Sequence, residues 1–138
     1  MILAIDQSTS STKALLFSPE GALVDRVSLD HRQIYPKPGW VEHDAGEIWG
    51  NTLSSVSILL ERNLEASKEI EFASITNQRE TLVVFERSTG KPVGHAIVWQ
   101  CARGEDVCDR LKSSPGAQLV KALTGLEIDS YFSAPKLK

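Results

Sequence analysis

The sequence has few cysteines and no long apolar run. Its 138 residues include two cysteines, Cys101 and Cys108, which lack the C-x-x-C spacing of a zinc or redox site. They suit free thiols in a reducing compartment better than a disulfide framework. No apolar stretch approaches the length needed to span a bilayer, so we expect no membrane partner.

Basic patches and metal motifs are also missing. The net charge is −3, and no arm or stripe of Lys and Arg is present, so nucleic acid is not expected as a partner. The histidines His31, His43 and His95 are scattered, and we expect each to be a surface or packing residue. The N-terminal segment reaches Asp6 too soon for a signal peptide. These features favour a cytoplasmic protein.

The composition that remains is typical of one globular domain. Apolar residues make up 41% and charged residues 24% of the chain, which is long enough to bury its own core. Short apolar segments separated by polar turns predict a three-stranded meander, followed by further strands. The predicted strands cover residues 1–6, 13–17, 22–29, 70–76, 82–85 and 96–99. We therefore expect an α/β fold with a mixed sheet of five or six strands flanked by helices.

Helical periodicity begins after Asp44. Asp44, followed three residues later by Glu47, is typical of a helix N-cap. Apolar residues then recur at helical spacing and should pack on the sheet. They are Trp49, Leu53, Val56, Leu60 and Leu64. Two further helices are predicted, over 102–111 and from Ser114-Pro115 to Gly125.

A loop rich in hydroxyl groups follows the first predicted strand. The strand ends at Asp6, whose carboxylate could hold Mg²⁺ through water, and residues 7–12 offer N–H and O–H donors to phosphate oxygens. Lys13 adds positive charge. The same pattern also suits a plain polar hairpin with a capping Asp. A P-loop is excluded because Gly90-Lys91 is followed by Pro92.

Arg79 and Glu80 follow another predicted strand, where side chains can project into a cleft. Together a guanidinium and a carboxylate offer donors and acceptors to the neighbouring hydroxyls of a small polyol. The alternative is a solvated surface ion pair.

In these motifs the sequence resembles the FGGY carbohydrate kinases, and glycerol kinases among them. The hydroxyl loop resembles the first phosphate loop of that family. Three longer segments carry the rest of the resemblance: residues 34–44, 76–81 and 97–101. The resemblance covers the whole chain. It implies a ribonuclease H-like fold of the actin and hexokinase type, with ATP and Mg²⁺ used to phosphorylate a small polyol, glycerol first of all.

The resemblance also implies roles for individual residues. In the family's phosphate loop, the residues that match Thr9, Ser10, Ser11 and Lys13 contact the nucleotide phosphates. In glycerol kinases, the residues that match Arg79, Glu80, Trp99 and Tyr131 bind glycerol. Trp99 would give an apolar wall and Tyr131 a hydroxyl; the alternative for both is packing in a core or interface.

Some positions depart from the family pattern. Ser8 stands where Gly is usual, Lys13 where Arg is usual, Ala102 where Arg is usual and Ser130 where Pro is usual. Lys13 keeps the charge but loses the bidentate fork of Arg. These changes bear on the substrate and its affinity. Kinases for xylulose carry a Gln-Met-His-Gly type segment near the position of Gln78, whereas this chain has Gln-Arg-Glu-Thr.

FGGY kinases are longer than this chain and have two domains. Their catalytic Asp comes later in the sequence, so we expect no catalytic residue here and little activity from the chain alone. The expected partners are ATP, a polyol and the second domain of the same polypeptide. Surfaces that meet that domain would be exposed in this chain alone, so a homo-oligomer could form as an artefact of their exposure. Two alternatives stay open: a kinase for another sugar or polyol, and a non-catalytic actin-like ligand-binding domain.

Overall fold

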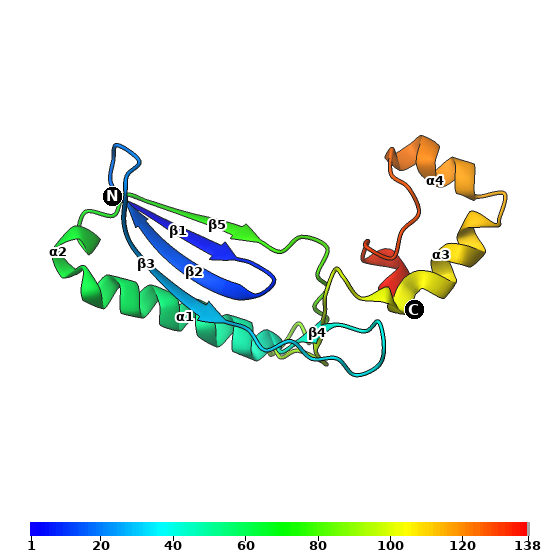
Figure 1. Cartoon of the computed structure of the whole chain (residues 1–138), viewed down its shortest axis with the longest axis horizontal. Helices are drawn as coiled ribbons and strands as arrows, with labels where there is room; N and C mark the ends of the chain where they lie inside the picture. The colour runs from blue at the N-terminus through cyan, green and yellow to red at the C-terminus, as the bar shows by residue number, and fades with distance from the viewer. Residues whose placement is uncertain (138) are drawn as a thin grey trace. The chain divides into compact units, whose positions relative to one another are not determined.

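The computed structural model describes residues 1–137, which divide into two compact units. Unit 1 consists of Met1–Gln33 and His43–Gln78, and unit 2 consists of Ile34–Glu42 and Arg79–Lys138. Figure 1 shows the elements of each unit along the chain.

Unit 1 is built on a mixed four-stranded sheet. Its strands are β1 (Ile2–Gln7), β2 (Ser11–Phe17), β3 (Leu23–Asp30) and β5 (Phe72–Asn77), in the order β3-β2-β1-β5. The first three strands form an antiparallel meander, and β5 pairs with β1 in parallel. The predicted meander and the mixed sheet are therefore confirmed.

Helix α1 (Ala45–Arg62) covers one face of this sheet and is followed by the short helix α2 (Leu64–Ser67) (Figure 1). The side chain of Asp44 accepts hydrogen bonds from the backbone N–H groups of Gly46 and Glu47, at 2.7 and 3.2 Å. It thus satisfies two of the donors that a helix start leaves without an internal partner. The predicted N-cap is confirmed.

The face that α1 turns to the sheet matches the predicted one only in part: Val56 of the predicted stripe packs against the core. Leu59 is fully buried with Leu3, Ala14, Leu16 and Val27, and Ser55 lies on the same buried face. By contrast, Trp49, Leu53 and Leu64 are 63%, 53% and 66% exposed. Helical spacing was correct, but the stripe was misplaced because Ser55 can be buried: its hydroxyl donates to the Thr52 carbonyl at 3.1 Å.

Unit 2 is made of short elements. They are β6 (Ala96–Ile97), η1 (Ala102–Gly104), α3 (Glu105–Lys112), α4 (Ala117–Thr124) and η2 (Ala134–Lys136). Gly125 lies just past the end of α4, as predicted, and its backbone is left-handed at φ 72°. The N-cap of α4 is Gly116, so this helix begins later than Ser114-Pro115 predicted. Within residues 1–137, every helix lacks the length or the apolar character that a membrane crossing requires.

The expected five or six strands do not form one sheet. Residues 82–85 make only isolated bridges, Leu82 with Ile97 and Phe85 with Pro92. Strand β6 belongs to a separate two-stranded sheet with β4 (Glu42–His43). Pro92 has no N–H to extend a ladder, and Val83 to Phe85 are exposed, so this apolar run has no second layer to pack against in the described chain.

Candidate functional site

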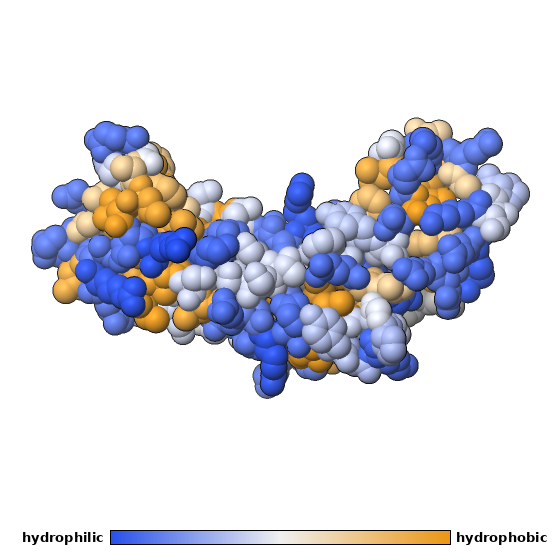
Figure 2. All heavy atoms as spheres, viewed as in Figure 1, coloured by the Kyte–Doolittle hydropathy of each residue, from blue (hydrophilic) through white to orange (hydrophobic). Residues whose placement is uncertain are grey.

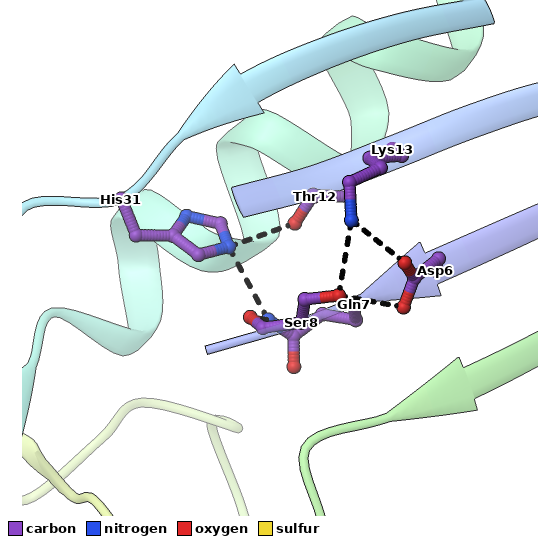
Figure 3. Close-up of polar contacts among 6 residues, drawn as sticks. All are labelled: Asp6, Gln7, Ser8, Thr12, Lys13 and His31. Carbon is purple, nitrogen blue, oxygen red and sulfur yellow. Dashed lines mark hydrogen bonds and ion pairs between the residues drawn. The ribbon is translucent and has the colours of Figure 1, made fainter. Parts of the chain in front are cut away.

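The loop between β1 and β2 is held by an ion pair across the two strands. The antiparallel register places Lys13 opposite Asp6, and Lys13 Nζ lies 2.9 Å from Asp6 Oδ2. Ser8 Oγ donates to Asp6 Oδ1 at 2.8 Å, and Lys13 Nζ also donates to Ser8 Oγ at 3.2 Å (Figure 3). The hydrogen bond from Lys13 holds the pKa of Asp6 below its ordinary value of 3.8. Asp6 is therefore ionised at neutral pH.

This arrangement also limits how the loop could take Mg²⁺. Among residues 1–137, no group of three or more His, Cys, Asp or Glu side chains could hold a metal ion. Mg²⁺ here would rely on one carboxylate, Asp6, with water and phosphate oxygens completing its shell, which is an arrangement that Mg²⁺ commonly adopts. The residues present fit the ion in that form.

The remaining predicted phosphate ligands lie at the tip and the far side of the loop. The loop closes through a hydrogen bond from Ser8 N–H to the Ser11 carbonyl at 2.9 Å. Ser10 is exposed and its carbonyl accepts from the N–H of His31 at 2.8 Å. Ser11 begins β2 and is only 5% exposed. The carbonyl of Thr9 accepts from Gln33 Nε2 at 3.1 Å.

Two buried histidines stabilise this loop through hydrogen bonds. Their scattered positions in the sequence did not indicate this role. His31 Nε2 lies 3.0 Å from Thr12 Oγ1 and 3.2 Å from Gln7 Nε2 (Figure 3). His31 and His43 are 6% and 1% exposed, with ring centroids 6.1 Å apart. They are packing residues, as expected. Burial lowers the pKa of both rings.

His43 reaches the loop through a glutamine. His43 Nε2 lies 2.9 Å from Gln33 Oε1, and Gln33 in turn donates to the Thr9 carbonyl. On its other side, His43 Nδ1 lies 3.4 Å from Gln78 Nε2. An amide oxygen facing Nε2 and an amide nitrogen facing Nδ1 fit a neutral ring with its proton on Nε2. This agrees with the lowered pKa.

In unit 2, two of the four predicted polyol ligands are in contact, and a third is hydrogen-bonded to the segment that follows them. The rings of Trp99 and Tyr131 meet edge to face with centroids 5.7 Å apart. The two residues also line an open depression of about 520 Å³. Glu80 has a left-handed backbone at φ 64°, and its carbonyl accepts from Ser133 Oγ at 3.2 Å.

Arg79 is exposed and forms no ion pair within residues 1–137. The alternative of a surface ion pair between Arg79 and Glu80 therefore does not hold in this structure. The guanidinium keeps all of its N–H donors for a ligand or solvent.

The segment at residues 34–44 has a structural role that the sequence did not indicate. The Arg103 guanidinium lies 4.0 Å from the centre of the Trp40 ring and donates to Glu42 and to Cys101 Sγ. Burial alone would raise the pKa of Glu42, but hydrogen bonds from Arg103 and His95 outweigh it and hold the pKa low. Arg103 thereby ties this segment to the chain after β6.

The comparisons with known proteins all indicate the same family. Residues 1–138 match the N-terminal domain of the FGGY family of carbohydrate kinases. Glycerol kinase 1 of Thermotoga maritima is 50% identical over 137 residues, and the glycerol kinase of Treponema denticola is 47% identical. Each alignment covers 99% of this chain and 28% of the relative, so the chain spans little more than a quarter of their length.

Solved structures agree with the sequence match. Plasmodium falciparum glycerol kinase, determined with ADP, has a TM-score of 0.85 at 36% identity, covering 99% of this chain and 27% of that one. Xylulose kinase of Rhodospirillum rubrum has a TM-score of 0.90 at 22% identity, covering 98% and 28%, and supports the fold. The ribonuclease H-like α/β fold is thus confirmed, and the chain belongs to the FGGY family of carbohydrate kinases, within its N-terminal domain.

Proposed function

We propose that the polypeptide containing this chain is a glycerol kinase, which transfers the γ-phosphate of ATP to glycerol and forms glycerol 3-phosphate. The observation that carries the proposal is 50% identity to a glycerol kinase over nearly the whole chain. The chain spans 28% of that relative. In this proposal the catalytic base and the adenine pocket come from the remainder of the full-length polypeptide. Two buried free thiols, Cys101 and Cys108, suit a cytoplasmic location.

In this proposal the β1–β2 loop binds the phosphates. Thr9, Ser10 and Ser11 supply donors to the phosphate oxygens, and Lys13 supplies a cation. The side chains of Lys13 and Asp6 are each 33% exposed, so a phosphate can reach Lys13 and share it with Asp6. Asp6 is the residue that would hold Mg²⁺, through water, and the bound ion would neutralise phosphate charge.

Unit 2 supplies the polyol ligands. The edge-to-face pair of Trp99 and Tyr131 provides an apolar wall for the carbon chain and a hydroxyl for a polyol oxygen. Arg79 and Glu80 provide the charged donors and acceptor that fix neighbouring hydroxyls. These residues bind and orient the acceptor, which is most of what phosphoryl transfer requires of a protein.

A substrate panel on the full-length polypeptide tests the acceptor. We expect kcat/KM with ATP and Mg²⁺ to be higher for glycerol than for xylulose or gluconate. A higher kcat/KM for a ketose than for glycerol would mean that the acceptor is a ketose. No phosphorylation of any sugar or polyol would favour a non-catalytic actin-like domain.

Two variants of the full-length polypeptide test the phosphate role of Lys13 and the polyol role of Glu80 separately. Lys13→Met should raise the KM for ATP by about tenfold and leave the KM for glycerol unchanged, because one charge-assisted contact is lost. Glu80→Gln should raise the KM for glycerol and leave the KM for ATP unchanged. If either variant changed both constants equally, the assignment of that residue to one substrate would be wrong.

A further inference from the structure

Unit 2 contains a buried lysine that none of the roles above uses. Lys136, at the end of η2, is 4% exposed, and its Nζ donates to the carbonyls of Trp99 and Tyr131, each at 2.9 Å. Within residues 1–137 it forms no ion pair with a carboxylate. A buried ammonium is costly and seldom improves stability over an apolar residue, so these two hydrogen bonds indicate a different role.

The two carbonyls belong to segments far apart in sequence. Trp99 follows β6 and Tyr131 precedes η2, yet the same ammonium holds both backbones. The rings of these residues then meet edge to face at 5.7 Å, and Tyr131 meets Phe132 in the same way at 5.2 Å. The lysine therefore sets the spacing of two aromatic residues that line one depression.

The segment around Lys136 also contacts Glu80, and it is itself fixed by tight packing. Ser133 Oγ donates to the carbonyl of Glu80, whose positive φ is rare for a residue with a side chain. Pro135 packs so tightly on Gly104 that a Cβ at Gly104 would lie 2.8 Å from Pro135 Cβ. Residues 131–136 thus join the backbones of three predicted polyol ligands.

We propose that Lys136 is a positioning residue of the polyol site, acting through the carbonyls of Trp99 and Tyr131 and not by touching the substrate. The inference rests on the proposed function, since it assumes that these aromatic side chains contact the acceptor. Its donors face the protein backbone, and its loss would let the two walls of the depression move apart. A misplacement of about 1 Å can cost about a hundredfold in rate.

The test compares Lys136→Met with Lys68→Met in the full-length polypeptide. Lys68 follows α2 in unit 1 and has a side chain that is 69% exposed, so it provides the same chemical change without touching the residues that line the depression. We expect Lys136→Met to lower kcat/KM for glycerol by about tenfold or more while the KM for ATP stays within about twofold. Lys68→Met should leave both unchanged, and Lys136→Arg should recover part of the loss.

A purely structural lysine predicts a different outcome. The proposal is overturned if Lys136→Met reduces the yield of folded enzyme but leaves the constants of the folded fraction unchanged, or if it shifts the constants for glycerol and ATP in parallel. If Lys136→Met does not fold, Lys136→Arg keeps the charge but changes the geometry of the donors, and it must raise the KM for glycerol alone; an unchanged KM would also overturn the proposal.

A second readout does not depend on activity. In ¹H–¹⁵N spectra of the full-length polypeptide, the Trp99 indole resonance should shift in Lys136→Met and stay in place in Lys68→Met. If the wild type phosphorylates no polyol but the indole shifts, the proposed function fails and the positioning contact stands. An unshifted indole contradicts the contact itself.

Discussion

The interior of unit 1 places His31 and His43 where protonation is unfavourable. Burial is the main cause of the lowered pKa of both rings. At His31 the nearby charges of Glu47 and Asp30 act in the opposite direction but do not outweigh burial, and at His43 the neighbouring His31 ring adds to the lowering. Both rings are therefore neutral in the folded protein at neutral pH, and both titrate near 6.5 only after unfolding.

This linkage predicts acid sensitivity in unit 1. Because the folded pKa lies below the unfolded value of 6.5, the unfolded state binds more protons as the pH falls through that value. The free energy of unfolding should be fully retained above 6.5 and decrease below it. Urea titrations at about pH 8 and about pH 5 would measure the loss.

Two variants sharpen this measurement. His31→Gln and His43→Gln each remove one titrating group, so each should flatten the pH dependence. The linkage would be refuted if both variants kept the slope of the wild type.

The sequence could predict some of these residue contacts. The hairpin that carries Asp6 and Lys13 could be predicted from its two apolar runs and the polar turn between them, and its antiparallel register places the two residues opposite each other. The hydrogen bonds that connect His43 through Gln33 to Thr9 could not be predicted, because they require the chain after β3 to lie next to the β1–β2 loop. The positions of Gln and His along the sequence show no periodic pattern that would indicate this contact.

Helix α1 illustrates what periodicity can and cannot decide at the scale of an element. Apolar residues occur on more than one side of this helix, so spacing identifies the helix without choosing its buried face. Leu59 is fully buried in the core of unit 1, whereas Leu53 is 53% exposed. The choice depends on a buried serine, which hydrophobic patterns count as polar.

A pair of identical substitutions on α1 tests this orientation. Leu59→Ala should lower the free energy of unfolding by about 2–5 kcal/mol, because it leaves a cavity in the core. Leu53→Ala should change it by no more than about 0.5 kcal/mol. Chemical denaturation of the two variants gives the comparison, and equal losses would mean that the predicted stripe, not the observed face, packs on the sheet.

Strands show a related limit. The meander was predictable because turns with Pro and Gly separate its apolar runs. The run at residues 82–85 has similar composition but only isolated bridges, with Val83 to Phe85 exposed. Composition therefore indicates a strand-like segment, whereas membership of a sheet depends on the partners that the rest of the chain provides.

For the whole molecule, the most informative surface is strand β5. It lies at an edge of the sheet, and all six of its residues are exposed, including Phe72 at 65% and Ile75 at 70%. Figure 2 shows that apolar residues reach the surface in both units. Edge strands with apolar side chains pair readily with other chains. The relatives are more than three times longer, so their additional sequence is available to cover such a surface.

We therefore expect this 138-residue chain by itself to associate through β5, in a manner that depends on concentration. Ile75→Lys places a charge on the exposed edge and should lower the association constant by about tenfold or more. Leu123→Lys, at a position on α4 that is 77% exposed, is the matched control and should have little effect. Sedimentation velocity over a concentration series measures both. Equal effects of the two substitutions on the association constant would indicate general hydrophobic association. A wild-type chain that is monomeric at every concentration would exclude association through β5.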